Sequence, residues 1–331
     1  MAELYPLKFE PILKEKVWGG KTLETVYNKK PVGLNNIGES WELSSYDDNL
    51  SVVSNGFLAG NNIEEIIEVF MGDITGDIIF EKFGTEFPLL FKFIEAKEDL
   101  SIQVHPNETL AMERHNAHGK TEMWYILKGD KKARIYTGFR DGITKELYKT
   151  SVLNGKVADL LNVETAEQGD AFFTPAGRIH AIGAGTVLVE IQQTSDLTYR
   201  ISDWNRIDSG NTPRKLHIEL ALDALDFNQT GKNKIKVEPV LNKTENLVGC
   251  EFFNTNIIRF NNVIDKEYYL IDSFVVYICL EGEFSILWDD NSEKVRKGET
   301  VLLPAMIKEV KLKPVNEAQL LEVYIKSESP T

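Results

Sequence analysis

The chain has 331 residues, and its hydrophobic and charged fractions of 42% and 27% are those of an ordinary globular protein long enough for two domains. Its net charge of −14 disfavours nucleic acid and anionic membranes as partners, so an anionic small ligand would need a local group of Lys and Arg. No run of about twenty apolar residues occurs, and the first residues, MAELYPLKFEP, lack a basic segment followed by an apolar one. We therefore expect a cytoplasmic protein, monomeric or homodimeric.

Two segments have helical periodicity. Apolar residues recur at helical spacing in NNIEEIIEVFMGDI, which predicts a helical segment near residues 62–85. The same spacing in PRKLHIELALDAL predicts a second helix over residues 213–226. We expect both to form a small helical layer beside the first of two β domains.

The β domains are predicted from two segments with the same layout. The first reads WYILKGDKKARIY and then EQGDAFFTPAGRIHAI, and the second reads VVYICLEGEFSILW and then VRKGETVLLPAMIKEV. In each, a strand ends at a glycine turn, and a second glycine turn begins an apolar strand that ends at a proline. Alternating apolar and polar residues between glycine turns favour a jelly roll or β-barrel over helices. We predict a mainly β protein with domains at residues 1–228 and 229–331, joined by the polar stretch 228–239.

The first β domain carries a group of metal-ligand residue types. Gln103 and His105 are two apart in an expected strand, so their side chains share a face. Glu122 follows shortly after, and His180 comes from the distant segment GRIHAIG. Two imidazoles, a carboxylate and a carboxamide suit a divalent metal and leave coordination positions open, as a catalytic site requires.

The second β domain lacks these residue types. It has Asp272 or Ser273 where the first domain has Glu122, and apolar or non-coordinating residues where the first has His180. We therefore expect it to contain no metal and no concentrated polar site.

Several of these motifs together resemble those of a known enzyme family. SIQVHP, GKTEMWY and PAGRIHAIG, with VWGG, GESWE and TYRISDWNR, occur in the order found in type I mannose-6-phosphate isomerases of the short bacterial form, which are cupin proteins. The resemblance implies two cupin domains, a catalytic first and a degenerate second, and one bound divalent metal, Zn²⁺. It also implies a small sugar phosphate as substrate, with mannose 6-phosphate and fructose 6-phosphate interconverted by an enediolate proton transfer.

The resemblance also implies a role for each matching residue. Lys92, Lys120 and Arg200 would supply the positive pocket that an acidic protein needs for a sugar phosphate, and Arg binds phosphate or an oxyanion through a planar fork. The group that moves the proton stays open between Glu190, Lys120 and a metal-bound water. The implied metal ligands are Gln103, His105, Glu122 and His180, the phosphate-binding residues are Lys92, Ser101, Lys120 and Arg200, and the catalytic residues are Arg200, Glu190 and Lys120.

Three other functions fit a cupin with such a site. Two histidines and a carboxylate also describe a non-haem metal oxygenase. Another cupin sugar-phosphate isomerase would perform the same proton transfer, and an inactive sugar-phosphate-binding cupin would retain the residues without turnover. His115 and His118 lie in a polar setting that indicates an exposed loop bordering the cleft, and His217 suits a solvent-facing or capping role.

Overall fold

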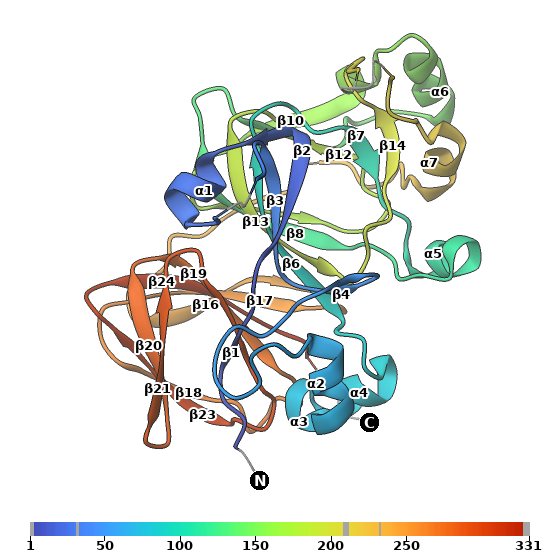
Figure 1. Cartoon of the computed structure of the whole chain (residues 1–331). Coiled ribbons are helices and arrows are strands. Elements are labelled where there is room, and N and C mark those ends of the chain that lie inside the picture. The colour runs from blue at the N-terminus through green and yellow to red at the C-terminus, as the bar shows by residue number, and fades with distance from the viewer. Residues whose placement is uncertain (1–2, 31–32, 208–211, 232, 327–331) are drawn as a thin grey trace. The chain divides into compact units, whose positions relative to one another are not determined.

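The computed structural model describes residues 3–30, 33–207, 212–231 and 233–326 (Figure 1). It divides into two compact units, each built from separate stretches of the chain. The central unit comprises Leu13–Ser40 and Phe91–Lys236, and the terminal unit comprises Met1–Ile12, Trp41–Leu90 and Val237–Thr331. The last boundary between the units falls after Lys236, and the terminal unit also includes residues from the first quarter of the chain.

Two antiparallel sheets form the central unit. The seven-stranded sheet has the order β15 (Lys234–Lys236), β11 (Asp170–Thr174), β8 (Glu122–Gly129), β13 (Thr186–Gln193), β6 (Leu89–Ala96), β3 (Ile37–Leu43) and β2 (Ile12–Gly20). The five-stranded sheet has the order β10 (Leu161–Thr165), β9 (Arg134–Phe139), β12 (His180–Ile182), β7 (Ile102–Val104) and β14 (Tyr199–Ser202). The chain crosses between the two units inside β2, β3 and β6 and again directly after β15.

The core of the central unit follows from side-chain alternation along these strands. Trp124 and Ile126 of β8 and Leu188 of β13 pack with Ile135 and Ile182 of the five-stranded sheet in one buried cluster. Side chains two apart on a strand share a face. The positions two residues before Trp124 and Ile182 therefore also face the space between the sheets. That space is apolar at one end of the strands and polar at the other.

Helices cover the other face of the five-stranded sheet. Tyr148 of α6 (Lys145–Leu153) and Leu222 of α7 (Ile218–Ala224) pack in a cluster with Val104 and Phe139 of the sheet. The remaining helices of this unit are α1 (Thr22–Tyr27), α5 (Glu108–His115) and the 3₁₀ turn η1 (Val157–Leu160). The helix predicted over 213–226 is therefore present in a shorter form, with His217 as its N-cap residue.

The expected linker 228–239 contains a strand. Residues Lys234–Lys236 pair antiparallel with Asp170–Phe172 and close one edge of the seven-stranded sheet. The polar composition suggested a loop, but an edge strand with one solvent-facing side has the same composition. This part of the linker prediction was wrong.

The terminal unit has a second pair of large sheets and a short hairpin. Phe260, Tyr277 and Leu320 of the first sheet pack against Phe284 and Leu312 of the second in one buried core. The six-stranded sheet has the order β1 (Leu7–Lys8), β22 (Thr300–Leu303), β19 (Val275–Glu281), β24 (Ala318–Tyr324), β17 (Asn254–Phe260) and β16 (Lys243–Gly249). The four-stranded sheet has the order β18 (Ile264–Glu267), β23 (Glu309–Pro314), β20 (Glu283–Trp288) and β21 (Asn291–Arg296), and the hairpin joins β4 (Ser45–Tyr46) to β5 (Asn49–Leu50). The mainly β prediction is confirmed.

The helical segment predicted near 62–85 exists but packs elsewhere than expected. It forms α2 (Ile63–Phe70), α3 (Gly72–Thr75) and α4 (Asp77–Phe83). The Phe274 amide donates to the Thr75 carbonyl, and the Asp272 carboxylate accepts from the amides of Asp77 and Ile78. These helices therefore belong with the C-terminal strands, because Asp272 caps α4 from that side. No helix in the described residues is long and apolar enough to cross a membrane.

The terminal unit also contains a buried polar cluster, contrary to the expectation that the second domain has no concentrated polar site. The Glu322 carboxylate, 1% exposed, accepts hydrogen bonds from Asn256 at 2.8 Å and Tyr268 at 2.6 Å, and Lys266 Nζ lies 2.8 Å away. Tyr268 also bonds Tyr277. Glu322 lies opposite Tyr277 in the pairing of β24 with β19. The cluster satisfies its own hydrogen bonds, which the sequence pattern did not indicate.

Candidate metal centre

Three of the predicted ligands meet at the polar end of the central unit. Glu122 is the first residue of β8 and, by alternation, shares the inward face of Trp124. His180 is the first residue of β12 and lies opposite Gln103 of β7 in the five-stranded sheet. His105 follows directly after β7. The two sheets thus bring ligands from distant parts of the sequence to one point.

The geometry of this triad suits a metal. Glu122 lies 3.5 Å from Nε2 of His105 and 3.4 Å from Nε2 of His180, through different carboxylate oxygens. One ligand atom from each residue lies within 4.8 Å of the others. All three side chains are at most 1% exposed.

Backbone carbonyls fix both imidazole rings. Nδ1 of His105 is 2.7 Å from the Leu197 carbonyl, and Nδ1 of His180 is 2.9 Å from the Arg178 carbonyl. A carbonyl can only accept, so each Nδ1 carries the proton and each Nε2 presents a lone pair toward Glu122. Both Glu122 oxygens are buried, and the oxygen nearest His105 also lies 2.9 Å from Lys120 Nζ. Outer hydrogen bonds of this kind orient metal-binding histidines, so the residues fit a divalent cation.

Charge in the site favours the same arrangement. Burial opposes ionisation of Glu122, but the Lys120 ammonium holds its pKa well below the usual range. Burial lowers the pKa of His180 to about 3, so its ring is neutral. Neutral imidazoles and an ionised carboxylate are the protonation states that bind metal.

Gln103 lies in the site but turns its amide nitrogen inward. Its Nε2 is 3.3 Å from Nε2 of His180, and its Oε1 accepts a hydrogen bond from Ser101 at 3.0 Å. A carboxamide ligates metal through oxygen, so Gln103 would become a ligand only after its amide turned over. Ser101 holds the present orientation.

A chain of buried ion pairs runs beside the triad. Lys120 Nζ lies 2.9 Å from Glu122 and 4.0 Å from Glu190, and Lys92 Nζ lies 3.3 Å from Glu190. Burial opposes charge on Lys120 and Lys92, but these carboxylates raise the pKa of both above the ordinary lysine value. Trp124 Nε1 donates to the other oxygen of Glu190 at 2.9 Å. Both lysines are charged, and neighbouring carboxylates already balance them.

Asp196 completes this chain and was missed by the sequence analysis. Its carboxylate lies 3.6 Å from Lys92 Nζ. It belongs to the loop between β13 and β14, which also supplies the Leu197 carbonyl that orients His105. A lone aspartate in a polar loop gives no sequence signal, because only the path of the loop brings it to the site.

Arg200 stands at the edge of the site. It lies opposite Gln103 in the pairing of β14 with β7, so the two side chains share a face of the sheet. One guanidinium nitrogen donates to the Lys215 carbonyl at 3.0 Å, and the buried Nε has no hydrogen bond. The register shifts just after Arg200, and such bulges redirect side chains near active sites.

The other histidines have different partners. His115 Nε2 is 2.8 Å from the Tyr199 hydroxyl, and His118 Nδ1 is 2.7 Å from Glu108. Nδ1 of His217 accepts the Arg200 amide at 3.1 Å. Within the described ranges, no group of three or more His, Cys, Asp or Glu side chains other than His105, Glu122 and His180 has metal-binding spacing.

Comparison with known proteins agrees with this geometry. Residues 6–133 match the family model for the phosphomannose isomerase type I catalytic domain. Over 315 residues the chain is 32% identical to mannose-6-phosphate isomerase ManA of Bacillus subtilis, covering 93% of this chain and 95% of that protein. The chain belongs to the type I phosphomannose isomerase family. A mannose-6-phosphate isomerase of Streptococcus mutans is 31% identical over 312 residues, covering 93% of this chain and 94% of that protein.

Solved structures support the same membership. The crystal structure of the mannose 6-phosphate isomerase from Bacillus subtilis matches with a TM-score of 0.84 and 30% identity, covering 97% of this chain and all of that one. The cupin architecture predicted from the sequence is thereby confirmed. None of these similarities favours an oxygenase, another sugar-phosphate isomerase or an inactive phosphomannose isomerase relative.

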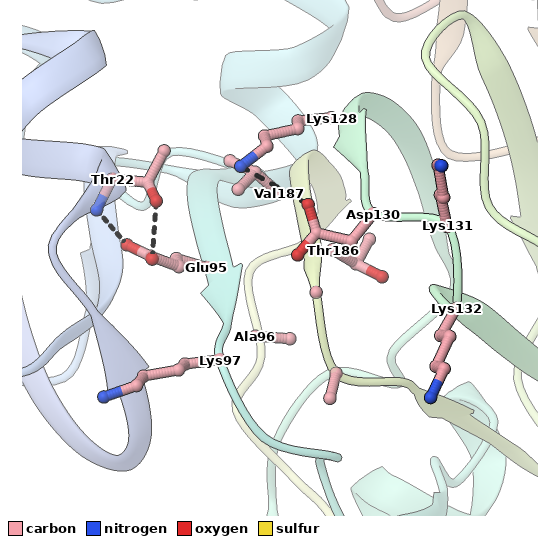
Figure 2. A pocket seen from close by; sticks show the side chains of 12 residues that line it. Thr22, Glu95, Ala96, Lys97, Lys128, Asp130, Lys131, Lys132, Thr186 and Val187 are labelled. Atoms are coloured by element: carbon pink, nitrogen blue, oxygen red, sulfur yellow. Dashed lines mark hydrogen bonds and ion pairs between the residues drawn. The ribbon is translucent and has the colours of Figure 1, made fainter.

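A separate cavity of about 460 Å³ lies at the opposite ends of the same strands (Figure 2). It is lined by Lys97, Lys128, Lys131 and Lys132, and Lys128 pairs with Asp130 at 3.4 Å. Strand β8 carries Glu122 at one end and reaches this cavity at the other, and β6 carries Lys92 near its middle and reaches the cavity at Glu95 and Ala96. With about 3.3 Å per residue, the length of β8 separates the cavity from the metal centre by roughly 20 Å.

Proposed function

We propose that this chain is a mannose-6-phosphate isomerase, which interconverts mannose 6-phosphate and fructose 6-phosphate with one bound Zn²⁺. The observation that carries the proposal is the convergence of His105, Glu122 and His180 beside buried lysine and glutamate pairs, in a member of this family. The interconversion of an aldose and a ketose requires a polarised substrate oxygen and a group that moves one proton between neighbouring carbons.

His105, Glu122 and His180 would hold the metal, with Gln103 as a fourth ligand or as an amide beside it. Metal bound there would polarise the oxygens on the reacting carbons. Leu197 and Arg178 keep the imidazoles in the ligating tautomer. With three protein ligands, a bound metal would keep a coordination position open for substrate.

Glu190 is the best candidate to carry the proton. Lys120 holds its own proton under the influence of neighbouring carboxylates, so it suits stabilising negative charge rather than accepting a proton. Glu190 is an acceptor kept in place by Trp124 and Lys92. A carboxylate on the same inward face as the metal ligands can take a proton from one carbon and return it to the next.

Arg200 is the best candidate to bind the phosphate or a developing oxyanion. Lys92 and Lys120 are engaged with carboxylates, whereas Arg200 faces the Gln103 side of the site with an unbonded Nε. A planar guanidinium binds such oxygens in a bidentate manner. Ser101 would add a hydroxyl beside it, and Lys92 would contribute positive charge from behind Glu190.

The sheets of the terminal unit would have a structural role. We assign catalysis to residues within 1–228 and treat residues 229–331 as a degenerate cupin without a metal. The buried Glu322 cluster contains no histidine and makes its own hydrogen bonds, which supports this division.

A coupled assay on chelator-treated protein tests the proposal. Mannose 6-phosphate is supplied, and fructose 6-phosphate is measured before and after one equivalent of Zn²⁺ is added. We expect activity to return with the metal. Calorimetric binding of the sugar phosphate without any product would instead indicate a binding protein, and no binding at all would reject the substrate.

A further inference from the structure

Glu108, the first residue of α5, joins two other segments beside the metal centre. Its Oε1 is 2.7 Å from Nδ1 of His118, and its Oε2 accepts the Gly119 amide at 2.9 Å. The same Oε2 accepts Nε2 of Gln193 at 2.8 Å. Burial opposes ionisation, but these three donors lower the pKa of Glu108. We call Glu108, His118, Gly119 and Gln193 the Glu108 hub.

Gln193 extends the hub to the strand that begins with Glu122. Its side-chain Oε1 accepts a hydrogen bond from the Thr121 backbone amide at 2.9 Å. Its backbone amide donates to the Thr121 carbonyl at 3.2 Å. Ser195 Oγ donates to the His118 carbonyl at 2.9 Å. The end of β13 and the loop after it are therefore tied to residues 118–121 at three points, two made by Gln193 and one by Ser195.

The segments joined in this way carry groups of the site. Lys120 lies between Gly119 and Thr121, whose amides both donate to the hub residues. The tied loop supplies Asp196 to Lys92 and the Leu197 carbonyl to His105. Movement of either segment would shift Lys120 and release the His105 ring.

Gly119 makes the junction close. A Cβ at Gly119 would lie 2.6 Å from the Glu108 nitrogen and 2.8 Å from the Asn107 carbonyl carbon, both backbone atoms that cannot turn aside. Only glycine lets the two backbones approach this far. The close approach of Gly119 to the start of α5 is thus constrained both by backbone packing and by the hydrogen bond to the Glu108 carboxylate.

We propose that Glu108 and Gln193 are positioning residues for the isomerase reaction, acting through Lys120 and through the Leu197 carbonyl that orients His105. The inference rests on the proposed function for its kinetic part. Supporting residues one step away from a metal site typically change activity or metal affinity by about 10- to 100-fold when removed. Nothing in the family match of residues 6–133 reaches Gln193.

The test compares Glu108→Ala, Gln193→Ala and the double variant with Glu113→Ala, an exposed glutamate on the same helix. Assays use Zn²⁺-loaded enzyme and record kcat, KM and Tm, and the exchange of the Lys120 amide is followed in metal-free protein. The Lys120 amide donates to the Pro106 carbonyl, so neither variant removes its acceptor.

We expect each single hub variant to lower kcat by about tenfold or more with KM changed less than about threefold. The kcat of the double variant should be no lower than that of the less active single variant, because the two residues act as a unit. Lys120 amide exchange should accelerate at least about tenfold in the hub variants and stay unchanged in Glu113→Ala.

Unchanged kcat and unchanged Lys120 exchange in both single variants would overturn the proposal. A fall in Tm with normal kcat would also overturn it, because the hub would then only stabilise the fold. If Glu108→Ala does not fold, Glu108→Gln and Gln193→Ala carry the test. An inactive wild-type enzyme would reject the proposed function, while the exchange measurement would still test the hub.

Discussion

At the scale of single residues, Glu122 has the most demanding environment in the molecule. It is fully buried, faces two Nε2 atoms, and has the Lys120 ammonium 2.9 Å away as a cationic partner. An isolated carboxylate in such a place would be expensive, and a cation at the centre of the triad removes that cost. The residue therefore links the stability of the site to metal binding.

Glu122→Gln should abolish metal retention and activity together. The amide keeps the size of the side chain but lacks the charge that balances a divalent cation. We expect bound Zn²⁺ to fall below about a tenth of an equivalent in dialysed protein, measured by elemental analysis. His115→Ala, which removes an exposed histidine bonded to Tyr199, should keep its metal. Equal metal loss in both variants would show that the ligands were misassigned.

Arg200→Ala should leave bound metal unchanged but lower kcat/KM by roughly a hundredfold, or about 3 kcal/mol, if the guanidinium stabilises phosphate or developing negative charge. Arg200→Lys keeps the charge but loses the planar fork, so it should recover only part of the loss. Steady-state kinetics on mannose 6-phosphate decide this. Near-normal turnover in the alanine variant would transfer the role to Lys92 or Lys120.

At the scale of elements, the turn between α3 and α4 shows how the helical segment is fixed to the C-terminal strands. Gly76 has φ +95, and a Cβ there would lie 2.5 Å from the Asp272 carbonyl oxygen. Gly84, at the other end of α4, has φ +60 but nothing within 4 Å of a Cβ. The two glycines share an unusual backbone and differ in their surroundings.

Gly76→Ala should therefore destabilise the protein more than Gly84→Ala does. Both variants place an alanine at a positive φ, which costs about 1 kcal/mol or more, but only the first also brings its Cβ within 2.5 Å of the Asp272 carbonyl oxygen. We expect an additional loss of about 1–3 kcal/mol in the free energy of unfolding, measured by urea denaturation. Similar losses in both variants would mean that the segment yields at Asp272 and is not held tightly there.

At the scale of the whole molecule, the two β units differ in what occupies their polar interiors. The central unit has histidines beside Glu122, and the terminal unit has Asn256, Tyr268 and Lys266 around Glu322. The first arrangement points two imidazole nitrogens at one carboxylate with metal-binding spacing, whereas the second surrounds its carboxylate with hydrogen-bond donors. One unit is suited to bind a metal and the other to hold its fold.

Glu322→Ala should destabilise the chain by about 3 kcal/mol, since it leaves Lys266 without its buried partner. Metal content should remain near one equivalent per chain. Thermal unfolding and elemental analysis of the same sample measure both quantities. A second equivalent in the wild type that disappears in this variant would instead reveal a metal site in the terminal unit.

The sequence by itself determined the mainly β architecture and the set of ligand residue types. Glycine turns and period-two alternation are local properties, and both survive in β8, β11, β19 and β22. Gln103, His105, Glu122 and His180 could be selected because their residue types and order are distinctive. Tertiary structure then brought the histidines and the glutamate within ligand distance of one another.

Only the tertiary structure decided the partition of the chain and the partners of its charges. The segment 62–85 reads as an amphipathic helix whichever surface it covers, so its packing with residues near Asp272 depends on the whole unit. Likewise, the sequence predicts that Lys92 and Lys120 bind phosphate. The structure pairs them with Glu190 and Glu122. Periodicity records which face of an element is apolar, but the neighbour across that face is set by long-range packing that no local pattern encodes.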